Sequence, residues 1–287
     1  MAITLGGGGS ASQINEVVFL SNDADTVTLA DGRVYLKGGV FETNTSTYPN
    51  AYKGLAYLGT NFSVAAQETT PQGIAWDGTH LWVLGSNADT AFKYTAAGVY
   101  TGTSFSLAGQ SNQPIGITWD GTYFWVLDQS LKTVFKYNSS GVYQSVSFSV
   151  NTQDSQPTGL TWDGTHLWVV GTATDSAYKY NSSGVYQNVS FSVGAQLTQP
   201  YGIAWDGTYF WVVGWQNDVA YKYNSSGVYQ NVSFSVASQM QVPTGIEWDG
   251  TDFLVIDQNL DVVYRYGDSI GIPSDTSFGA QNYTRIA

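Results

Sequence analysis

Carboxylates recur at two positions of a 43-residue spacing in this chain, and they are the side chains best suited to chemistry. Asp128 and Asp257 share one position. The other position holds, in chain order, Asp89, Lys132, Asp175, Asp218 and Asp261. Carboxylates grouped around a pore can bind Ca²⁺, a hard cation that prefers oxygen ligands. Asp side chains also bond to the amides of their own turn, so turn formation is the alternative interpretation.

One tryptophan stands apart from the nine others, which recur in register and are expected to be core residues. Trp215 lies between Gly214 and Gln216, with Asn217 next along the chain. A solvent-facing indole among amides suits stacking on a sugar, or a hot spot for a protein partner. Packing against a neighbouring loop is the alternative.

Signals for an enzyme are weak. The two histidines, His80 and His166, each follow Asp-Gly-Thr and lie far apart in sequence, which makes them poor general bases. No nucleophile elbow, metalloprotease helix or phosphate loop occurs. Acidic pairs could act as glycosidase carboxylates, but the spacing selects no two of them. We therefore expect no enzyme, with a polysaccharide lyase or glycoside hydrolase as the alternative.

The elements that must position these residues are repeats marked by the tetrapeptide Trp-Asp-Gly-Thr. Its copies begin at Trp76, Trp119, Trp162, Trp205 and Trp248. Each repeat contains three short β-rich runs, such as 73–76, 81–84 and 91–94, and a fourth ending in Ser-Phe-Ser-Val or a close variant. Asp-Gly between two such runs is typical of a hairpin. Four antiparallel strands per repeat predict an all-β fold, the β-propeller.

A degenerate copy of the repeat precedes the regular ones, at residues 26–64. It predicts six four-stranded blades, five regular and one degenerate, with the propeller at 26–287 and a flexible arm at 1–25. Residues 14–20 form a candidate strand that would pair with the last blade and close the ring. In the alternative, residues 1–50 are a separate anchor module and five blades remain.

The turns of a blade divide between two faces of the wheel. Those joining strands one to two and three to four repeat Asp-Gly-Thr and Asn-Ser-Ser-Gly-Val-Tyr with little change, and we call their side the constant-turn face. The turns joining strands two to three, such as 85–89 and 214–218, and the connections between blades differ in every repeat. Their side is the variable-loop face.

Recognition normally uses loops on a rigid scaffold, so we expect binding on the variable-loop face. Neutral drift in tolerant loops is the alternative interpretation. The predicted binding residues are Trp215, Gln216, Asn217, Asp89, Asp128, Lys132, Asp175, Asp218, Asp257 and Asp261.

Composition excludes several classes of function. The net charge of -12, without a Lys/Arg cluster, disfavours nucleic acid. The absence of cysteine excludes disulfides and Cys-based metal sites. No apolar run reaches about 18 residues and no basic, apolar leader opens the chain, so we expect neither membrane insertion nor a secretory signal.

The repeat also carries a family resemblance. Pro-x-Gly-Ile-x-Trp-Asp-Gly, followed by Trp-Val and Lys-Tyr, resembles the NHL and streptogramin-lyase-like propeller repeats over the five regular copies. The resemblance implies the fold. For lyase activity it would imply histidine and glutamate converging at the pore face, where this chain has no histidine.

The N-terminal segment resembles a narrower group. Residues 15–20, 28–36 and 47–51 are similar to the starts of predicted tail and fibre proteins of bacteriophages. This resemblance implies a virion structural protein, made in the host cytoplasm, that attaches to other virion proteins through its N-terminal segment and is oligomeric on the particle. Its variable-loop face would bind a host-surface glycan or protein. A cellular adhesin or scaffold is the alternative.

Overall fold

The computed structural model describes residues 25–28, 34–37, 55–268 and 284–285. The chain forms two units, Met1–Tyr52 with Gly271–Ala287, and Lys53–Ile270. In the first unit, β1 (Asp25–Thr28), β2 (Val34–Lys37) and β23 (Thr284–Arg285) form a three-stranded sheet. No helix in the described residues could cross a membrane.

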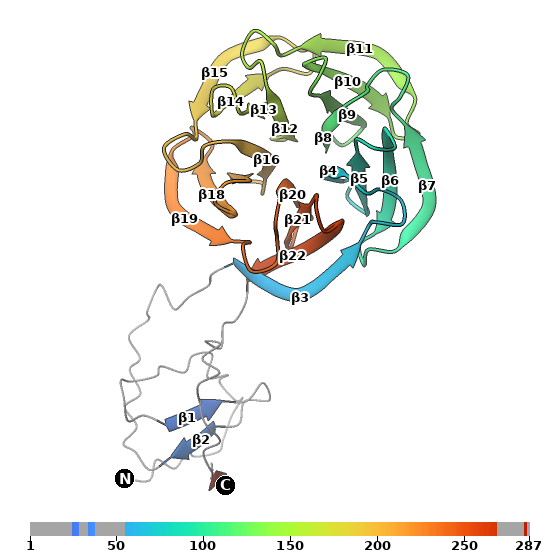
Figure 1. The fold of residues 1–287 in the computed structure, drawn as a ribbon. Helices are drawn as coiled ribbons and strands as arrows, with labels where there is room; N and C mark the ends of the chain where they lie inside the picture. Colours follow the sequence, from blue (N-terminus) through green and yellow to red (C-terminus); the bar gives the residue numbers. More distant parts are fainter. Residues whose placement is uncertain (1–24, 29–33, 38–54, 269–283, 286–287) are drawn as a thin grey trace, which may run out of the picture. The chain divides into compact units, whose positions relative to one another are not determined.

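The second unit is a propeller of five four-stranded antiparallel blades (Figure 1). From the inner to the outer strand, the first four blades are β4 (Pro71–Trp76), β5 (His80–Gly85), β6 (Thr90–Thr95) and β7 (Tyr100–Ser106); β8 (Pro114–Trp119), β9 (Tyr123–Asp128), β10 (Thr133–Asn138) and β11 (Tyr143–Ser149); β12 (Pro157–Trp162), β13 (Leu167–Gly171), β14 (Ser176–Tyr180) and β15 (Tyr186–Ser192); and β16 (Pro200–Trp205), β17 (Tyr209–Gly214), β18 (Val219–Asn224) and β19 (Tyr229–Ser235).

The fifth blade joins the two ends of the propeller. It contains β20 (Pro243–Trp248), β21 (Phe253–Asp257), β22 (Val262–Asp268) and, as its outer strand, β3 (Leu55–Ser63). Strand β3 runs antiparallel to β22 and closes the ring by backbone pairing (Figure 1). Closure by one strand from the other end of the sequence removes the exposed edges that a row of open blades would have.

The prediction of six blades is wrong, and its five-blade alternative fits. Residues 26–64 do not form a blade, because β1 pairs with β2 and β2 with β23, whereas β3 belongs to the fifth blade. The Asn-Phe-Ser-Val pattern correctly identified an outer strand but could not show which sheet that strand joins. The candidate closing strand at 14–20 lies outside the described residues.

A ring of glycines allows the inner strands to meet. Gly73, Gly116, Gly159, Gly202 and Gly245 occupy one position of the repeat. A Cβ built on Gly159 would lie 2.4 Å from the carbonyl oxygen of Tyr201, in the next blade. One built on Gly245 would lie 2.9 Å from the carbonyl oxygen of Gln72. Glycine is required here for the close approach of backbones, not for an unusual φ.

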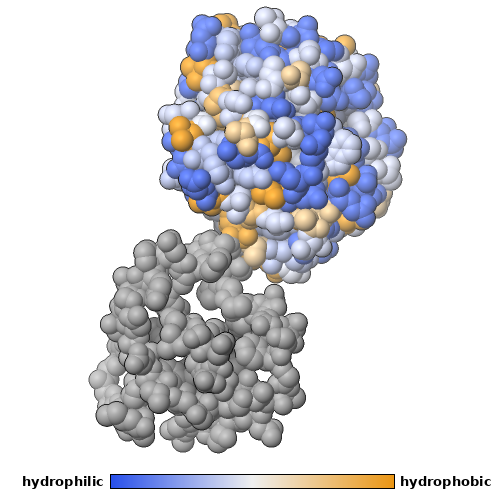
Figure 2. Space-filling view, turned by 60° about the vertical axis from the view of Figure 1, so that its left-hand side comes forward, coloured by the Kyte–Doolittle hydropathy of each residue, from blue (hydrophilic) through white to orange (hydrophobic). Residues whose placement is uncertain are grey.

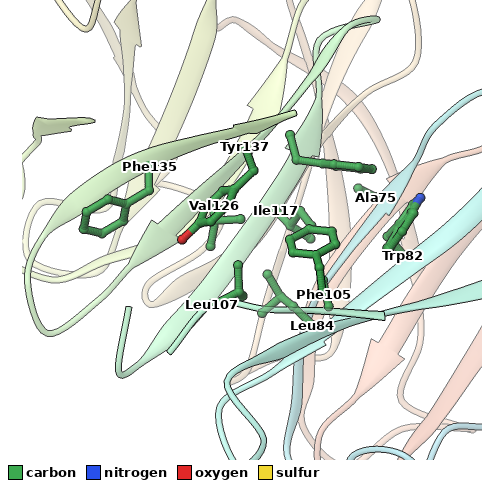
Figure 3. Close-up of a cluster of buried hydrophobic side chains, with 11 residues drawn as sticks. Ala75, Trp82, Leu84, Phe105, Leu107, Ile117, Val126, Phe135 and Tyr137 are labelled. Carbon is green, nitrogen blue, oxygen red and sulfur yellow. The ribbon is translucent and has the colours of Figure 1, made fainter. Parts of the chain in front are cut away.

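Aromatic side chains fill the wedge between neighbouring blades. Between the first two blades, Trp82 of β5 packs on Phe124 of β9 with ring centroids 4.9 Å apart, and Phe105 and Tyr137 join the same cluster (Figure 3). Equivalent tryptophan–phenylalanine pairs link the third blade to the fourth and the fourth to the fifth, at 4.9 and 5.0 Å. The expectation that the recurring tryptophans are core residues is confirmed for these buried indoles.

The aspartate of Trp-Asp-Gly-Thr holds its own turn. Oδ1 of Asp77 accepts hydrogen bonds from the backbone N–H groups of Thr79 and His80, and Oδ2 accepts one from the indole N–H of Trp82 at 2.8 Å. Gly78 has φ +92°, a conformation that favours glycine. Because the same bonds recur in the second, third and fourth blades, the uniformity of the constant-turn face has a structural reason.

Candidate functional site

The variable segments lie together at one end of each blade. In four blades the turn between the second and third strands bonds to the connection that precedes the blade. The backbone donors and acceptors are Ser86 to Thr70, Gln129 to Gln113, Thr172 to Gln156 and Gln258 to Val242, at 2.9–3.3 Å. The variable-loop face is therefore a bonded surface in which the two kinds of segment support one another.

A buried carboxylate bridges the turn and the connection in these blades. Oδ2 of Asp128 accepts hydrogen bonds from the hydroxyl of Ser111 and the backbone N–H groups of Asn112 and Gln113, and Oδ1 accepts one from Leu131 N–H. Burial raises the pKa of Asp128, but these bonds outweigh it and hold the pKa below the ordinary value. We call this arrangement the carboxylate bridge.

The carboxylate bridge of the fifth blade uses Asp257. Its side chain accepts hydrogen bonds from backbone N–H groups of the preceding connection, at 241–242, and of the turn, at 259–260. Asp128 and Asp257 are both fully buried. These two residues were predicted to bind a partner, but their burial and their bonds make them supports of the loops. Burial excludes both from the exposed surface.

In the first and third blades the bridging carboxylate belongs to the connection before the blade and not to the turn. Glu68 accepts from Thr70 N–H and Ala88 N–H at 2.8 and 3.0 Å. Its Cγ lies 2.0 Å from where a Cβ on Gly85 would stand, so only glycine fits opposite it. Asp154 and Gly171 repeat this pairing.

Our sequence reasoning missed Glu68 and Asp154. The sequence carries a signal for them, because the bridge joins one position in the connection to one position in the turn and one of the two is an acid. The pairs are Glu68 with Gly85, Ser111 with Asp128, Asp154 with Gly171, and Met240 with Asp257. The fourth blade departs from this rule.

The fourth blade has no carboxylate bridge. The two positions hold Leu197 and Gly214, and the leucine side chain fills the space where a Cβ on Gly214 would stand. Gln199 adopts φ +61°, and its N–H donates instead to Oδ1 of Asp175, in the third blade, at 2.9 Å. The backbone N–H of Trp215 does not make the bond to the connection that its four counterparts make.

This corner exposes an aromatic group. Trp215 is 47% exposed, and its ring stands edge-on to Tyr201 of β16 with centroids 6.3 Å apart. Oε1 of Gln216 accepts a hydrogen bond from the hydroxyl of Thr198 at 2.9 Å. Asn217 is exposed beside them. The structure thus gathers three of the predicted binding residues into one exposed patch, which we call the Trp215 corner.

The recurring acidic position is explained by turn geometry. Asp89, Lys132, Asp175, Asp218 and Asp261 all have φ between +45° and +54°. Aspartate tolerates this left-handed conformation better than most residues. The turn interpretation therefore accounts for the position. The described part of the chain contains no group of three or more His, Cys, Asp or Glu side chains placed to hold a metal ion.

These turn residues still make the variable-loop face acidic. Burial raises the pKa of Asp89, Asp218 and Asp261, and nearby bridge carboxylates raise it further. Each of the three has a buried Oδ1 without a hydrogen-bond partner. Together the turns and connections carry eight carboxylates and one cation, Lys132.

One further acid lies on the inner strands. Glu247 of β20 stands where the other blades have Ala or Thr, and it is the one carboxylate in the five inner strands. Glu247 is partly exposed, and the buried part of its side chain raises its pKa to about 8, although a hydrogen bond from Trp248 N–H opposes the rise. The sequence signal, a glutamate in an otherwise apolar strand, was overlooked.

Neither a protein-family model nor a curated protein sequence matches this chain. The glutaminyl cyclase of Myxococcus xanthus has a similar structure, with a TM-score of 0.57 and 12% identity over 74% of this chain and 95% of that chain. A catalytically inactive virginiamycin B lyase from Staphylococcus aureus, with quinupristin, gives a TM-score of 0.47 and 18% identity over 86% and 82%. A chain of the nidogen–laminin complex gives 0.46 and 18% over 62% and 67%.

At these identities structural likeness establishes the propeller fold alone. The strand topology bears out the propeller architecture that the repeat resemblance implied. The resemblance of the N-terminal segment to bacteriophage proteins stays a prediction.

We predict that Glu247→Gln changes how stability depends on pH. The folded pKa of about 8 exceeds the ordinary 4.5, so the folded protein retains this proton between those values. Its stabilising effect is complete below pH 4.5 and is lost as pH rises through 8. The variant should match the parent at pH 5 and exceed it at pH 9 by a few kcal/mol, at about 1.4 kcal/mol per pKa unit. Urea unfolding at both pH values measures this, and parallel pH profiles would contradict it.

We predict that Leu197→Asp installs the missing carboxylate bridge, because Asp154 with Gly171 shows that this pairing fits. The new carboxylate should accept the N–H groups of the 215–217 turn and slow their hydrogen exchange by about tenfold, the effect of one charge-assisted hydrogen bond. Leu197→Asn is the matched control without the charge. Equal protection in both variants, or in neither, would refute the bridge.

Proposed function

We propose that this protein is a non-catalytic binding propeller that contacts a surface glycan or protein through its variable-loop face, with the Trp215 corner as the central contact. One observation carries this proposal. Four blades hold their variable segments with a carboxylate bridge, whereas the fourth blade lacks the bridge and presents a half-exposed indole. Drift alone gives no reason for a large aromatic residue at the one unbridged corner.

The chemistry of the corner suits a sugar or a polar protein surface. An indole offers a flat apolar face for stacking. The amide nitrogen of Gln216 can donate to a ligand and the amide oxygen of Asn217 can accept from one. The other atoms of these amides are engaged, since Gln216 Oε1 accepts from Thr198 and Asn217 Nδ2 donates to Gln196 and Tyr221. Tyr201 supports the indole from the inner strand. Figure 2 shows hydrophobic residues scattered among hydrophilic ones on the side of the propeller that it presents.

The acidic groups of the variable-loop face limit the kinds of partner that can bind there. The acidic variable-loop face repels polyanions, which disfavours nucleic acids and phosphate-rich polymers on this side. A neutral glycan or a cationic protein segment fits better.

A non-catalytic role is supported by the state of the carboxylates. Glycoside hydrolases need two free carboxyl groups within about 5–10 Å on either side of a bond. Here Asp128, Asp154 and Asp257 are engaged by backbone amides, and the acids with an unbonded Oδ1, Asp89, Asp218 and Asp261, stand in three different blades. The lyase or hydrolase alternative keeps less support than binding.

We further propose that the protein is an appendage of a bacteriophage virion, attached through its N-terminal segment and present there as an oligomer. The support is the resemblance of residues 15–20, 28–36 and 47–51 to the starts of tail and fibre proteins. Most of that segment lies outside the described residues. The division of the chain at Tyr52 suits an attachment unit that is separate from the propeller.

We expect Trp215→Ala to weaken binding to an array of neutral and acidic oligosaccharides, or to host cells, by tenfold or more, the effect of losing a central aromatic contact of about 1.4 kcal/mol. Leu131→Ala is the matched control, because Leu131 is 48% exposed in the equivalent turn of the second blade. Unchanged binding by Trp215→Ala would remove the corner from the proposal.

The virion proposal predicts that the N-terminal segment attaches to the particle and that the propeller binds the host surface. The full protein should bind virions produced without it, whereas residues 53–270 should not, although both adsorb to host cells. Co-sedimentation with purified particles measures this. Particle binding by the propeller alone, or by neither protein, would count against a virion appendage.

A further inference from the structure

A pocket of about 340 Å³ opens on the constant-turn face, between the first two blades, on the opposite side from the Trp215 corner. It is lined by Asp77, Thr79, His80, Trp82, Lys93, Trp119, Phe124 and Ser139. This volume is at the lower end of the range for ligand pockets, so it suits a single ring rather than an oligomer.

The polar wall of this pocket has two available nitrogen donors. The carboxylate of Asp77 is occupied by two backbone N–H groups and the indole of Trp82. Lys93 Nζ lies 4.0 Å from that carboxylate and His80 Nδ1 lies 3.8 Å from it, both beyond hydrogen-bond distance. Both side chains are partly exposed, at 24% and 30%. Neither nitrogen is hydrogen-bonded to Asp77, so a ligand carboxylate could bond to both of them in competition with that aspartate.

The opposite wall comes from the second blade. Trp119, at the end of β8, is partly exposed and packs on Phe124 with ring centroids 4.5 Å apart. Ser139, in the turn between β10 and β11, adds a hydroxyl. A flat aromatic surface facing polar donors is the combination that a sugar ring requires.

The other blades show which contacts engage the lysine when a residue other than histidine stands at the His80 position. In the second and fourth blades, tyrosine replaces His80, and the lysines Lys136 and Lys222 lie 3.8 Å from the ring centroids of Tyr123 and Tyr209. In these blades a cation–π contact engages the lysine.

In the fifth blade, Arg265 occupies the junction and bonds to the carboxylates of Asp249 and Asp252 and to the carbonyl oxygen of Ala96. The third blade instead repeats the histidine and lysine of the first blade, as His166 and Lys179. Its His166 has a buried Nδ1 without a hydrogen-bond partner, and Lys179 Nζ lies 5.6 Å from the ring centroid of Trp168. Lys93 Nζ likewise lies 5.3 Å from the ring centroid of Trp82. In the two histidine blades the lysine therefore has one tryptophan ring beside it, and neither a tyrosine ring nor a pair of carboxylates engages it.

We propose that the pocket between the first two blades binds a carboxylated sugar ring, a hexuronic acid. Lys93 and His80 bind the carboxylate, Trp119 stacks on the ring, and Ser139 bonds to a ring hydroxyl. The corresponding residues of the third and fourth blades form a second copy of the site. They are Asp163, His166, Lys179, Trp205 and Ser225. This face bears a cation at one position of every blade, beside the aspartate of each Trp-Asp-Gly-Thr turn.

The test is a titration of the full chain with D-glucuronate and with D-glucose, followed by the indole N–H signals of Trp82 and Trp168 in NMR spectra. Both signals should shift with glucuronate, and glucose should bind at least about tenfold more weakly, because it lacks the carboxylate. Equal binding of glucose, or no binding of glucuronate, would overturn the proposal.

His80→Tyr provides the site-specific variant, because the second and fourth blades already carry tyrosine at this position and the fold accepts it. It should abolish the glucuronate shift at Trp82 and leave the shift at Trp168. His166→Tyr should do the reverse. Leu131→Ala, on the opposite face, is the control and should change neither. Persistence of the Trp82 shift in a folded His80→Tyr protein would overturn the assignment.

Discussion

The inner strands approach one another so closely that a side chain cannot stand between them. At Gly159 and Gly245 even a Cβ would press on a carbonyl oxygen of the next blade. Because each glycine occupies the same place in its blade, the five strands meet around a common axis, and the space between blades widens outward. Indole and phenyl rings fill that wedge. The rest of the structure depends on this contact, since it sets the angle at which every turn is presented.

The two faces satisfy their backbone amides in different ways. On the constant-turn face, an aspartate such as Asp77 bonds to its own turn, so the solution is local and the tetrapeptide is repeated. On the variable-loop face, one carboxylate must serve two segments that are distant in sequence. It can come from either segment, as Glu68 and Asp128 show. The remaining residues of these segments are then free to differ, which is how a rigid wheel can carry unlike loops.

The same architecture places charges on both faces. Acids stand on the variable-loop face as bridges and left-handed turn residues, and lysines and one arginine recur beside the aspartates of the constant turns. Cation–π contacts and the bonds of Arg265 engage most of these cations. The proposed neutral or cationic partner and the proposed uronic acid therefore belong to opposite faces, because the recurring cations lie beside the constant turns.

Much of this protein follows from local sequence. The Asp-Gly turns predict hairpins because glycine accepts the φ of +92° found at Gly78, and alternate turns must lie on opposite ends of an antiparallel blade. Trp215 was singled out from the sequence because it alone breaks the tryptophan register.

Long-range pairing decided the rest. The pattern of β3 marks an outer strand, but only the folded ring shows that it joins β22, more than 190 residues away, and leaves five blades. Asp128 and Asp257 resembled surface acids until the adjacent segments were seen to bury them. The pocket between the first two blades needs His80 and Trp119 side by side, and two blades must pack before they meet. Turn chemistry acts over a few residues and can be inferred from sequence, whereas closure, burial and pocket formation arise from contacts between blades.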